Sequence, residues 1–391
     1  MKNFRKIFAA LLLCGAVILT GCSDAGKDKK ASETEKEAVV QNDAQETVEN
    51  TQELPEEDTV TEENAETTEE TEPAEEESEE VEEQLPLFVN KLTGLETTEL
   101  LADVRPVAIM INNLKQALPQ QGISQADIMY EVLAEGGITR LLCLFTDYAS
   151  LPETGSVRSS RDYYIDLADA HDAIYVHCGT SPQATAVLKE RNTNNMDGIY
   201  FSTPFYRNAE RRKNMGQEHS MMTTGEFLVK GIEQKGYRTQ SDADQPFSFN
   251  VTDTPLESGL KADRMELTFS YYQTVELEYD AESGVYLKKQ YGKPHMDSNN
   301  DTQLTFENAL VLYCEQGAIK GDDAGRLYVN FFGDGEGQYM SNGEYKNIKW
   351  HKDSRTSTYT IYEEDGVTEV LLNPGKTYVA IAPAYISAVF E

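Results

Sequence analysis

The 391 residues include 68 Asp and Glu against 34 Lys and Arg, which gives a formal net charge of −34. Binding to DNA or RNA requires a basic surface, so this balance excludes nucleic acid as an expected partner. The chain is longer than one hydrophobic core usually serves, and we therefore expect more than one domain.

The chain begins with the three parts of an export signal. A positively charged start is followed by an apolar run at residues 7–19 and by the sequence Leu-Thr-Gly-Cys22, which matches a lipobox. The apolar run is short for a membrane span, which favours a cleaved signal over a transmembrane helix. We predict a lipoprotein signal peptide at residues 1–21 and lipidation of Cys22. An ordinary secretory signal that ends at a chance cysteine is the alternative.

Lipidation would give Cys22 two or three acyl chains of the palmitate type, which hold a protein on a membrane far better than one chain does. The expected location is therefore the extracytoplasmic face of the cell membrane. The membrane, reached through this lipid, is the first predicted partner.

The segment that follows Cys22 is strongly acidic. Residues 23–86 contain 25 Asp and Glu and four Lys, a net charge of −21, with almost no aromatic or branched apolar residue. Such a composition cannot offset the entropy cost of ordering, so residues 22–86 are predicted to be a disordered tether that charge repulsion extends. Residues 87–391 keep a net charge of −16.

Three cysteines remain after the signal and the lipidation site, and each lies in an apolar stretch typical of a strand. An odd number in such surroundings predicts buried core thiols rather than a disulfide framework. A bond between Cys143 and Cys178 is the minority interpretation. The third cysteine is Cys314.

Residues 87–245 alternate between strand and helix patterns, which predicts a mixed α/β domain. Continuous apolar runs predict strands at 107–112, 127–133, 139–147 and 173–177. Helices are predicted at 158–170, at 182–190 after the N-cap Ser181, and at 227–234 after a capping box at 223–226. Gly236 is expected to end the last helix.

Residues 246–391 change to short Tyr-, Val- and Thr-rich runs divided by turn dipeptides, which predicts a β-rich domain. Hairpin loops are predicted at 333–337 and 364–366. Strands are predicted at 267–273, 275–279, 285–291, 309–314, 327–332, 358–362, 367–372 and 377–381. The whole chain is thus expected to be an α+β protein, with a twisted antiparallel sheet or partial barrel in its C-terminal half.

Polar residues gather where the predicted elements of the first domain meet. Glu135 and Arg140 flank a glycine pair that allows a tight turn. Arg158 and Arg161 stand three apart at a predicted helix start, where N–H groups and arginine forks can hold a carboxylate or phosphate. His177 ends the next strand. Ligands of open α/β sheets lie outside the carboxyl ends of strands, so we expect one cleft there.

A second polar group surrounds His219, with Glu218 and three nearby arginines. Each candidate also has a structural interpretation: an arginine can pair with a buried glutamate, Ser159 and Ser160 can cap a helix, and His177 can be a hydrogen-bonded strand-end residue. The five histidines lack metal-ligand spacing, so no metal and no cofactor are predicted.

Several motifs together resemble the YerB family of lipoproteins. They are the segments 105–113, 126–131, 135–140, 156–161, 172–177, 181–182, 292–297, 325–326 and 350–352. The resemblance covers nearly all of 105–391 and implies an extracytoplasmic protein with an α/β-type domain followed by a β-rich one. Cys178 stands where the family tends to have a further glycine, and residues 217–220 also depart from its pattern. The resemblance implies no biochemical activity.

Two functions are consistent with these observations. The first is a non-enzymatic envelope protein that binds a glycan, a wall precursor or a partner protein through the N-terminal cleft. The second is a wall-acting hydrolase or transferase in which Glu135 or His177 is the general acid or base. The second lacks an evident nucleophile or second carboxylate. Cys178 adjoins His177, but neighbouring strand residues point to opposite faces.

Overall fold

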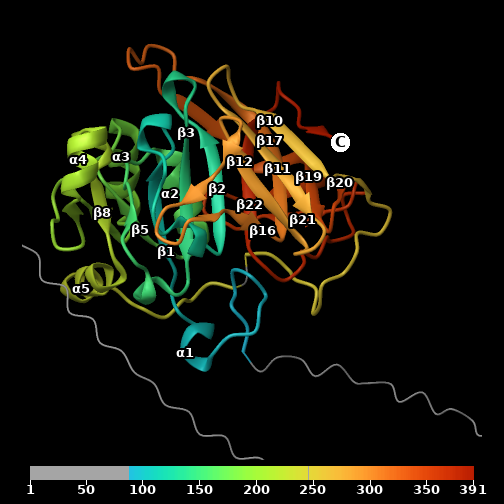
Figure 1. The fold of residues 1–391 in the computed structure, drawn as a ribbon, viewed down its shortest axis with the longest axis horizontal. Helices are drawn as coiled ribbons and strands as arrows, with labels where there is room; N and C mark the ends of the chain where they lie inside the picture. Colours follow the sequence, from blue (N-terminus) through green and yellow to red (C-terminus); the bar gives the residue numbers. More distant parts are fainter. Residues whose placement is uncertain (1–87, 245) are drawn as a thin grey trace, which may run out of the picture. The chain divides into compact units, whose positions relative to one another are not determined.

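The computed structural model describes residues 88–244 and 246–391. The predicted signal peptide, Cys22 and the acidic tether lie outside the described residues. The described chain has the predicted α+β fold, with its helices in the N-terminal half and mostly strands in the C-terminal half (Figure 1). Within the described part, no helix combines the length and the apolar character needed to cross a bilayer.

One mixed sheet of twelve strands runs through both halves of the described chain. The two halves meet where β2 pairs in parallel with β22, from Ile128 opposite Thr377 to Val132 opposite Ile381. The strands along the sheet are β21 (Thr360–Tyr362), β20 (Glu344–Lys352), β19 (Gly333–Ser341), β17 (Asn308–Ala318), β22 (Thr377–Pro383), β2 (Ile128–Leu133), β3 (Thr139–Phe145), β1 (Val107–Asn112), β5 (Ile174–His177) and β6 (Asn195–Asp197), while β18 (Leu327–Asn330) pairs with β17 and β9 (Leu260–Lys261) with β20.

A second sheet of six strands packs against the C-terminal half of the first. Its order is β13 (Lys293–Pro294), β12 (Val285–Gln290), β11 (Thr274–Asp280), β10 (Arg264–Thr268) and β23 (Val389–Phe390), with β16 (Thr305–Phe306) beside β12. Two small sheets are formed by β14 (Met296–Asp297) with β15 (Thr302–Gln303), and by β4 (Thr154–Gly155), β8 (Met221–Thr223) and β7 (Tyr206–Arg207).

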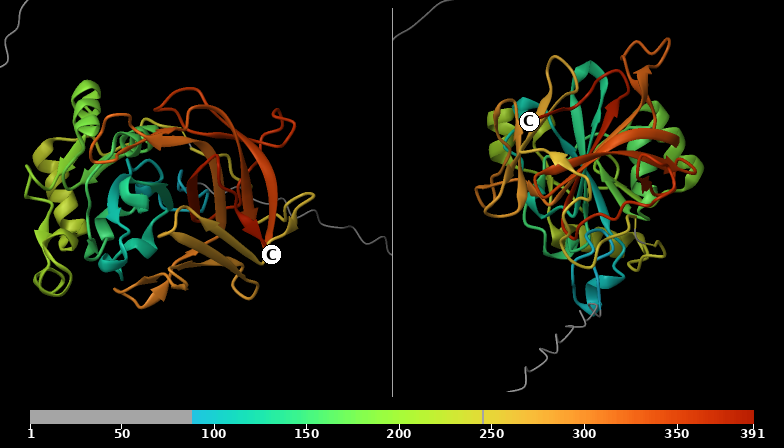
Figure 2. Two further views of the ribbon diagram at one scale, coloured as in Figure 1. Left: turned by 90° about the horizontal axis from the view of Figure 1, so that it is seen from above. Right: turned by 90° about the vertical axis from the view of Figure 1, so that its right-hand side faces the viewer.

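All helices but the first, which buries no residue, lie around the N-terminal half of the large sheet (Figure 1). The helices are α1 (Glu99–Ala102), α2 (Asp162–Ala170), α3 (Pro182–Arg191), α4 (Ala209–Met215) and α5 (Gly225–Lys235), and single 3-10 turns occur at Lys115–Ala117, Ile123–Gln125, Glu135–Gly137, Tyr148–Ser150 and Gln217–His219. Figure 2 shows helices α2 to α5 at one end of the molecule and the two β layers of the C-terminal half at the other.

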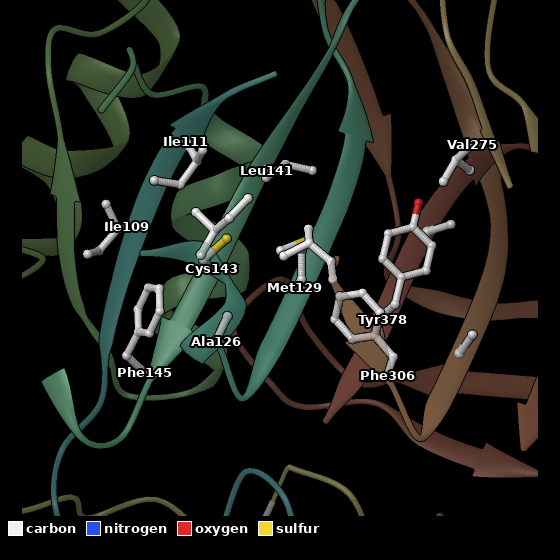
Figure 3. Packing of buried hydrophobic residues seen from close by; sticks show 14 of the residues in the cluster. Ile109, Ile111, Ala126, Met129, Leu141, Cys143, Phe145, Val275, Phe306 and Tyr378 are labelled. Atoms are coloured by element: carbon white, nitrogen blue, oxygen red, sulfur yellow. The ribbon is translucent and has the colours of Figure 1, made fainter. Parts of the chain in front are cut away.

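The two faces of the large sheet belong to different parts of the core. Alternate residues of a strand point to opposite faces, and Ile109, Met129 and Cys143 pack on the face that the second sheet and α5 cover (Figure 3). Tyr130 and Leu142 pack on the other face, together with α2. Because both faces are covered, the central strands read as continuous apolar runs, which is why the sequence reveals them.

Most of the predicted strands and helices are confirmed, often to within two residues. Ser181 is the N-cap of α3, with its side chain accepting from Ala184 N, and Gly236 ends α5 in the left-handed region. The capping box is displaced by one residue, because Thr224 rather than Thr223 caps α5. The turn at 364–366 is confirmed by the hydrogen bond from Gly366 N to Glu363 O.

Four element predictions are wrong, of which the strand at 267–273 is described with the candidate site below. The helix predicted at 158–170 begins only at Asp162, because the residues before it run in extended conformation beside β1. The loop predicted at 333–337 is part of β19, where glycines are tolerated because Trp350 and the β17 backbone pack directly against them. Residues 367–372 form only isolated bridges rather than a strand.

The three cysteines in the described residues are free thiols, which excludes the minority interpretation of a Cys143–Cys178 disulfide in this structure. Cys143 and Cys314 are buried in the two core clusters, and Cys178 is half-buried. Burial raises the pKa of all three thiols, with the effect on Cys143 and Cys314 being large. Low reactivity is the expected consequence.

A fully buried ion pair lies between the two sheets. Lys288 of β12 approaches Glu131 of β2, with Nζ 3.2 Å from Oε2, and neither side chain is exposed at all. The two carboxylate oxygens of Glu131 also accept hydrogen bonds from Thr139, Gln273 and Tyr378 at 2.7 to 2.9 Å. Burial lowers the pKa of Lys288, and the negative charge of Glu131 opposes that shift.

This pair belongs to a closed ring of side-chain hydrogen bonds that joins residues far apart in sequence. Lys288 donates to His295 Nδ1 at 3.1 Å, and His295 Nε2 donates to Gln120 Oε1 at 2.8 Å. Gln120 in turn donates to Asn113, which donates to Glu131. Each buried polar group thereby gains a partner, which is the condition for tolerating so many of them between two sheets.

We expect Lys288→Met to lower the free energy of unfolding by about 3 kcal/mol or more, because it leaves the Glu131 carboxylate buried without its cation. The double variant Glu131→Gln, Lys288→Met should recover much of that loss. Chemical denaturation of each purified variant measures both values.

Lys289→Met is the matched control for this comparison. Lys289 neighbours Lys288 on β12 but pairs with Glu278 at the surface, where both side chains keep substantial exposure. Surface pairs contribute at most about 1 kcal/mol. Equal losses for the two lysine variants would contradict the role assigned to the buried pair.

Candidate functional site

The candidate residues lie at the edge of the large sheet where its parallel strands end. β1 and β2 run in the same direction, because both pair antiparallel with β3. β5 and β6 are parallel to β1, and β22 and β17 are parallel to β2, so all six strands run toward this edge. Glu135 follows the end of β2, Arg140 lies at the start of the antiparallel β3, and His177 is the last residue of β5. The structure thus gathers segments from 112 to 197 at one edge.

Glu135, Arg140 and Arg161 form one ion cluster, here named the Glu135 cluster. Arg140 Nη2 lies 3.0 Å from Glu135 Oε1, and Arg161 reaches both oxygens of the same carboxylate, its Nε at 2.9 Å from Oε2. The arginine side chains are nearly buried at 5% and 8% exposed, while that of Glu135 is 23% exposed. Solvent therefore reaches the cluster mainly through the carboxylate.

Local backbone structure fixes this cluster. Gly136 and Gly137 both have φ of +73°, a conformation that side chains disfavour, and this turn reverses the chain between β2 and β3. Helix α2 is held beside it by Tyr163, whose hydroxyl donates to Leu133 O, and by Tyr164, whose hydroxyl donates to Val132 O, both at 2.9 Å. The sequence prediction of a tight glycine turn between Glu135 and Arg140 is confirmed.

The cluster keeps Glu135 ionised. Burial alone would raise the pKa of this carboxyl, but the hydrogen bonds from Arg161 and the charges of Arg140 and Arg161 outweigh burial and lower the pKa to about 2. Arg140 also donates to Ser159 O, and Ser159 Oγ donates to Cys178 O at 2.9 Å. Ser159 thus connects the Glu135 cluster to the loop after β5.

Arg158 and Arg161 are three residues apart but serve different carboxylates. Arg158 Nη2 lies 2.9 Å from Glu218 Oε2, and Glu218 also approaches His219 Nε2 at 3.3 Å. Residues 158–161 are extended rather than helical, so side chains at odd spacing point to opposite sides. The two arginines are therefore not neighbours gripping one anion.

The two candidate histidines are both buried. His219 is 4% exposed, and its Nδ1 accepts a hydrogen bond from Asn112 Nδ2 at 2.8 Å. His177 is 0% exposed, with Nδ1 3.0 Å from Gly179 O and Nε2 3.2 Å from Asn195 Oδ1. Burial lowers the pKa of both rings. The structural interpretation of His177, a hydrogen-bonded residue at the end of a strand, therefore agrees with its contacts.

Two exposed tyrosines follow Ser270, which contacts the Gly136–Gly137 turn next to Glu135, and they were not found from the sequence. Tyr271 and Tyr272, here named the tyrosine pair, are 84% and 54% exposed, and their ring centroids are 3.8 Å apart. Ser270 Oγ donates to Gly137 O, which holds the β10–β11 turn against the glycine turn. The sequence pattern placed these tyrosines in a strand at 267–273, but β10 ends at Thr268. The sequence signal that could have revealed the tyrosine pair is the Ser-Tyr-Tyr-Gln run before Thr274.

In the described residues, no group of three or more His, Cys, Asp or Glu has the arrangement of a metal site.

The same fold and motifs occur in a known protein. A Bacillus subtilis (strain 168) protein named "Putative lipoprotein YerB" is 31% identical over 294 residues, covering 75% of this chain and 85% of that protein. This chain belongs to the YerB family. The family models described as "Protein of unknown function (DUF3048)" match with the N-terminal domain over residues 92–238 and with the C-terminal domain over residues 265–379.

The crystal structure of the Bacillus subtilis YerB protein has a similar fold. It superposes with a TM-score of 0.68 at 27% identity, covering 77% of this chain and 99% of the YerB chain. The resemblance predicted from the sequence motifs is confirmed. In this chain both halves contribute strands to one sheet, and the domain limits predicted from sequence at 245 and 246 stay a prediction.

We expect the Glu135 cluster to stabilise the fold in a pH-dependent way. The folded pKa of about 2 lies below the value of about 4.3 for a free glutamate. The stabilisation is therefore complete above about pH 5 and is lost as the pH falls toward 2. The free energy of unfolding of wild type should decline more steeply over this range than that of Glu135→Gln.

Glu210→Gln controls for the loss of one acidic side chain, because Glu210 is exposed on α4 and forms no ion pair within the described residues. Denaturant titrations at half-unit pH steps measure the three curves. Superimposable curves for wild type and Glu135→Gln would show that the cluster contributes no stability.

Proposed function

We propose that this protein is a lipid-anchored binding protein on the extracytoplasmic face of the cell membrane, and that it holds an envelope glycan without altering it covalently. The observation that carries the proposal is the exposed tyrosine pair, which lies next to the Gly136–Gly137 turn that follows Glu135, at the edge where the parallel strands of the large sheet end. The surface formed by the tyrosine pair, the Glu135 cluster and the Gly136–Gly137 turn is named the edge surface below.

The lipid anchor rests on two independent observations. The sequence has a lipobox that ends in Cys22 after an export signal, and the Bacillus subtilis relative is named as a lipoprotein. Lipidation of Cys22 places the folded part outside the cytoplasm, at a distance set by the 65 residues from 22 to 86. The materials of the envelope are then the available ligands.

The edge surface suits a sugar chain for reasons of chemistry. A pyranose ring has an apolar face that packs on an aromatic ring, and Tyr combines a large apolar body with a polar tip. Contiguous exposed apolar patches rimmed by polar residues mark interaction sites. Glu135 adds a carboxylate acceptor that Arg140 and Arg161 hold in place, so little ordering cost is left at binding.

The same geometry favours binding over catalysis. A general acid must hold a proton near neutral pH, and the pKa of Glu135 is about 2 because of its two arginines. As a base it would have to release hydrogen bonds on both oxygens. His177 is fully buried, so a substrate does not reach its ring without a local rearrangement.

The remaining sequence candidates take a different place in this proposal. Arg158 and His219 meet Glu218 away from the carboxylate of the Glu135 cluster. We therefore assign ligand contact to Glu135 and the tyrosine pair, and we assign Arg140 and Arg161 to the positioning of Glu135.

Tyr271→Ala and Tyr272→Ala should each weaken retention on purified, protein-free cell wall by about tenfold, the size of a single aromatic hot spot of ~1.4 kcal/mol. Tyr271→Phe should retain most of the affinity, because it keeps the ring. The measurement is co-sedimentation of the protein with increasing amounts of wall.

Leu100→Ala is the matched control, since Leu100 is 82% exposed on α1, which Figure 1 draws at the opposite side of the molecule from β10. The wall is also assayed for new reducing ends and released peptides. If wild type changes the wall covalently and Glu135→Gln does not, the binding function is wrong and the protein is a hydrolase or transferase. Absence of retention by wild type would contradict the glycan and favour a partner protein.

A second comparison separates the two ion groups at this edge. Glu135→Gln should weaken wall retention severalfold, because it removes the charged acceptor next to the tyrosine pair. Arg158→Ala should leave retention within twofold of wild type. The reverse order in the same co-sedimentation assay would move the site to Arg158 and Glu218.

A further inference from the structure

A second surface feature lies apart from the edge surface, where the chain leaves β12. Residues 291–301 extend from the second sheet to the N-terminal half, and this excursion includes the 292–297 motif on which part of the family resemblance rests. It is fastened there by the carboxylate of Asp297, which accepts from Gly122 N at 3.0 Å and from Ser124 N at 2.9 Å. The excursion and the loop at 115–119 line an open pocket of about 460 Å³.

The walls of this pocket are mostly apolar. They consist of Leu118, Pro119, Tyr291, Pro294 and Met296, of which the two prolines are exposed and the other three half-buried. The volume falls in the range of sites for small organic ligands. An apolar group that enters would therefore bury surface at both partners, which is favourable in proportion to the area.

The mouth of the pocket has the opposite charge to the rest of the protein. Lys115 and Lys293 line it, both are exposed, and neither forms an ion pair within the described residues. Lys115 Nζ stands 5.7 Å from the centroid of the Tyr291 ring. Asp301 is the one carboxylate in the lining. The pocket lining thus has two cations and one anion, although residues 87–391 have a net charge of −16. This local excess of positive charge favours a ligand with negative charge.

The floor of the pocket is polar but uncharged and rigid. His295 and Gln290 line it, and each is 2% exposed. Both nitrogens of His295 are occupied, by Lys288 and Gln120, and burial together with the Lys288 charge holds the pKa of His295 well below its usual range. Gln290 donates to Asn113 Oδ1 at 2.8 Å. The floor is thus built into the ring of hydrogen bonds around Glu131.

From the apolar walls and the two lysines we infer that this pocket binds a free, single-chain anionic amphiphile. Its apolar part packs between Pro119, Tyr291 and Met296, and its carboxylate, sulfonate or phosphate group meets Lys115 and Lys293. The site shares no residue with the edge surface, so it is independent of the glycan proposal.

The test uses the chain from residue 22 onward with Cys22→Ser, so that neither acyl chains nor detergent interfere. The probe is 1-anilinonaphthalene-8-sulfonate, an aromatic sulfonate whose fluorescence rises in apolar surroundings. We expect saturable binding of one probe per chain. Dodecanoate should displace the probe, and dodecyltrimethylammonium, which has the same tail with a positive head, should not.

Met296→Trp fills the pocket and should weaken probe binding at least tenfold. Lys115→Glu with Lys293→Glu should weaken it at least fivefold and should abolish the preference for dodecanoate. Lys261→Glu is the matched control, because Lys261 is 75% exposed on β9 and does not line the pocket. Unfolding curves confirm that each variant is folded.

Unchanged probe binding in Met296→Trp, or equal displacement by the two amphiphiles, would overturn the inference. A third arm uses vesicles of phosphatidylglycerol and phosphatidylcholine. Sedimentation of the protein with these vesicles, lost on the double lysine substitution, would identify a membrane lipid as the occupant and would overturn the free ligand.

Discussion

The structure depends most on the buried pair of Glu131 and Lys288, which joins the two halves of the described chain. Neither side chain is exposed, and the two come from different sheets, 157 residues apart in sequence. A charge in such a place is costly without its partner. In the register that the two sheets adopt, Lys288 meets Glu131, and Gln273 and Tyr378 complete the carboxylate's hydrogen bonds.

This constraint extends to both proposed sites. Gln273 follows the tyrosine pair directly, so fixing Gln273 on Glu131 also fixes the β10–β11 turn beside Gly137. On the other side of the pair, Lys288 fixes His295, which lines the pocket floor. One buried network thus positions two surfaces that lie on residues from both halves. A movement of either surface away from its position would break hydrogen bonds of this network.

The ion pairs at the sheet edge have a different character. The Glu135 cluster is partly open to solvent and combines one carboxylate with two arginines, whereas Arg158 and Glu218 form a more exposed pair. The sequence left open whether all these residues converge on one cleft, and the extended backbone at 158–161 separates Arg158 from Arg161. A helix at this point would have placed both arginines on one side. The backbone conformation of the four residues 158–161 therefore decides whether the two arginines lie together or apart.

Local patterns in the sequence predicted the elements that are governed by local rules. Apolar runs identified the central strands, Ser181 before Pro182 identified the start of α3, and Gly136–Gly137 identified the turn, because each depends on nearby residues alone. The same patterns missed β19, where glycines pack against Trp350, since that contact comes from a neighbouring strand.

The sequence by itself determined the predicted signal and lipidation site at Cys22, the acidic character of the chain, the α+β class and the family. The tertiary structure alone decided that Lys288 meets Glu131, that the exposed Tyr272 lies next to Gly137, and that His295 underlies a pocket. The physical reason is that these contacts join positions more than 100 residues apart, and such contacts follow from strand order and sheet packing rather than from the spacing of residues along the chain.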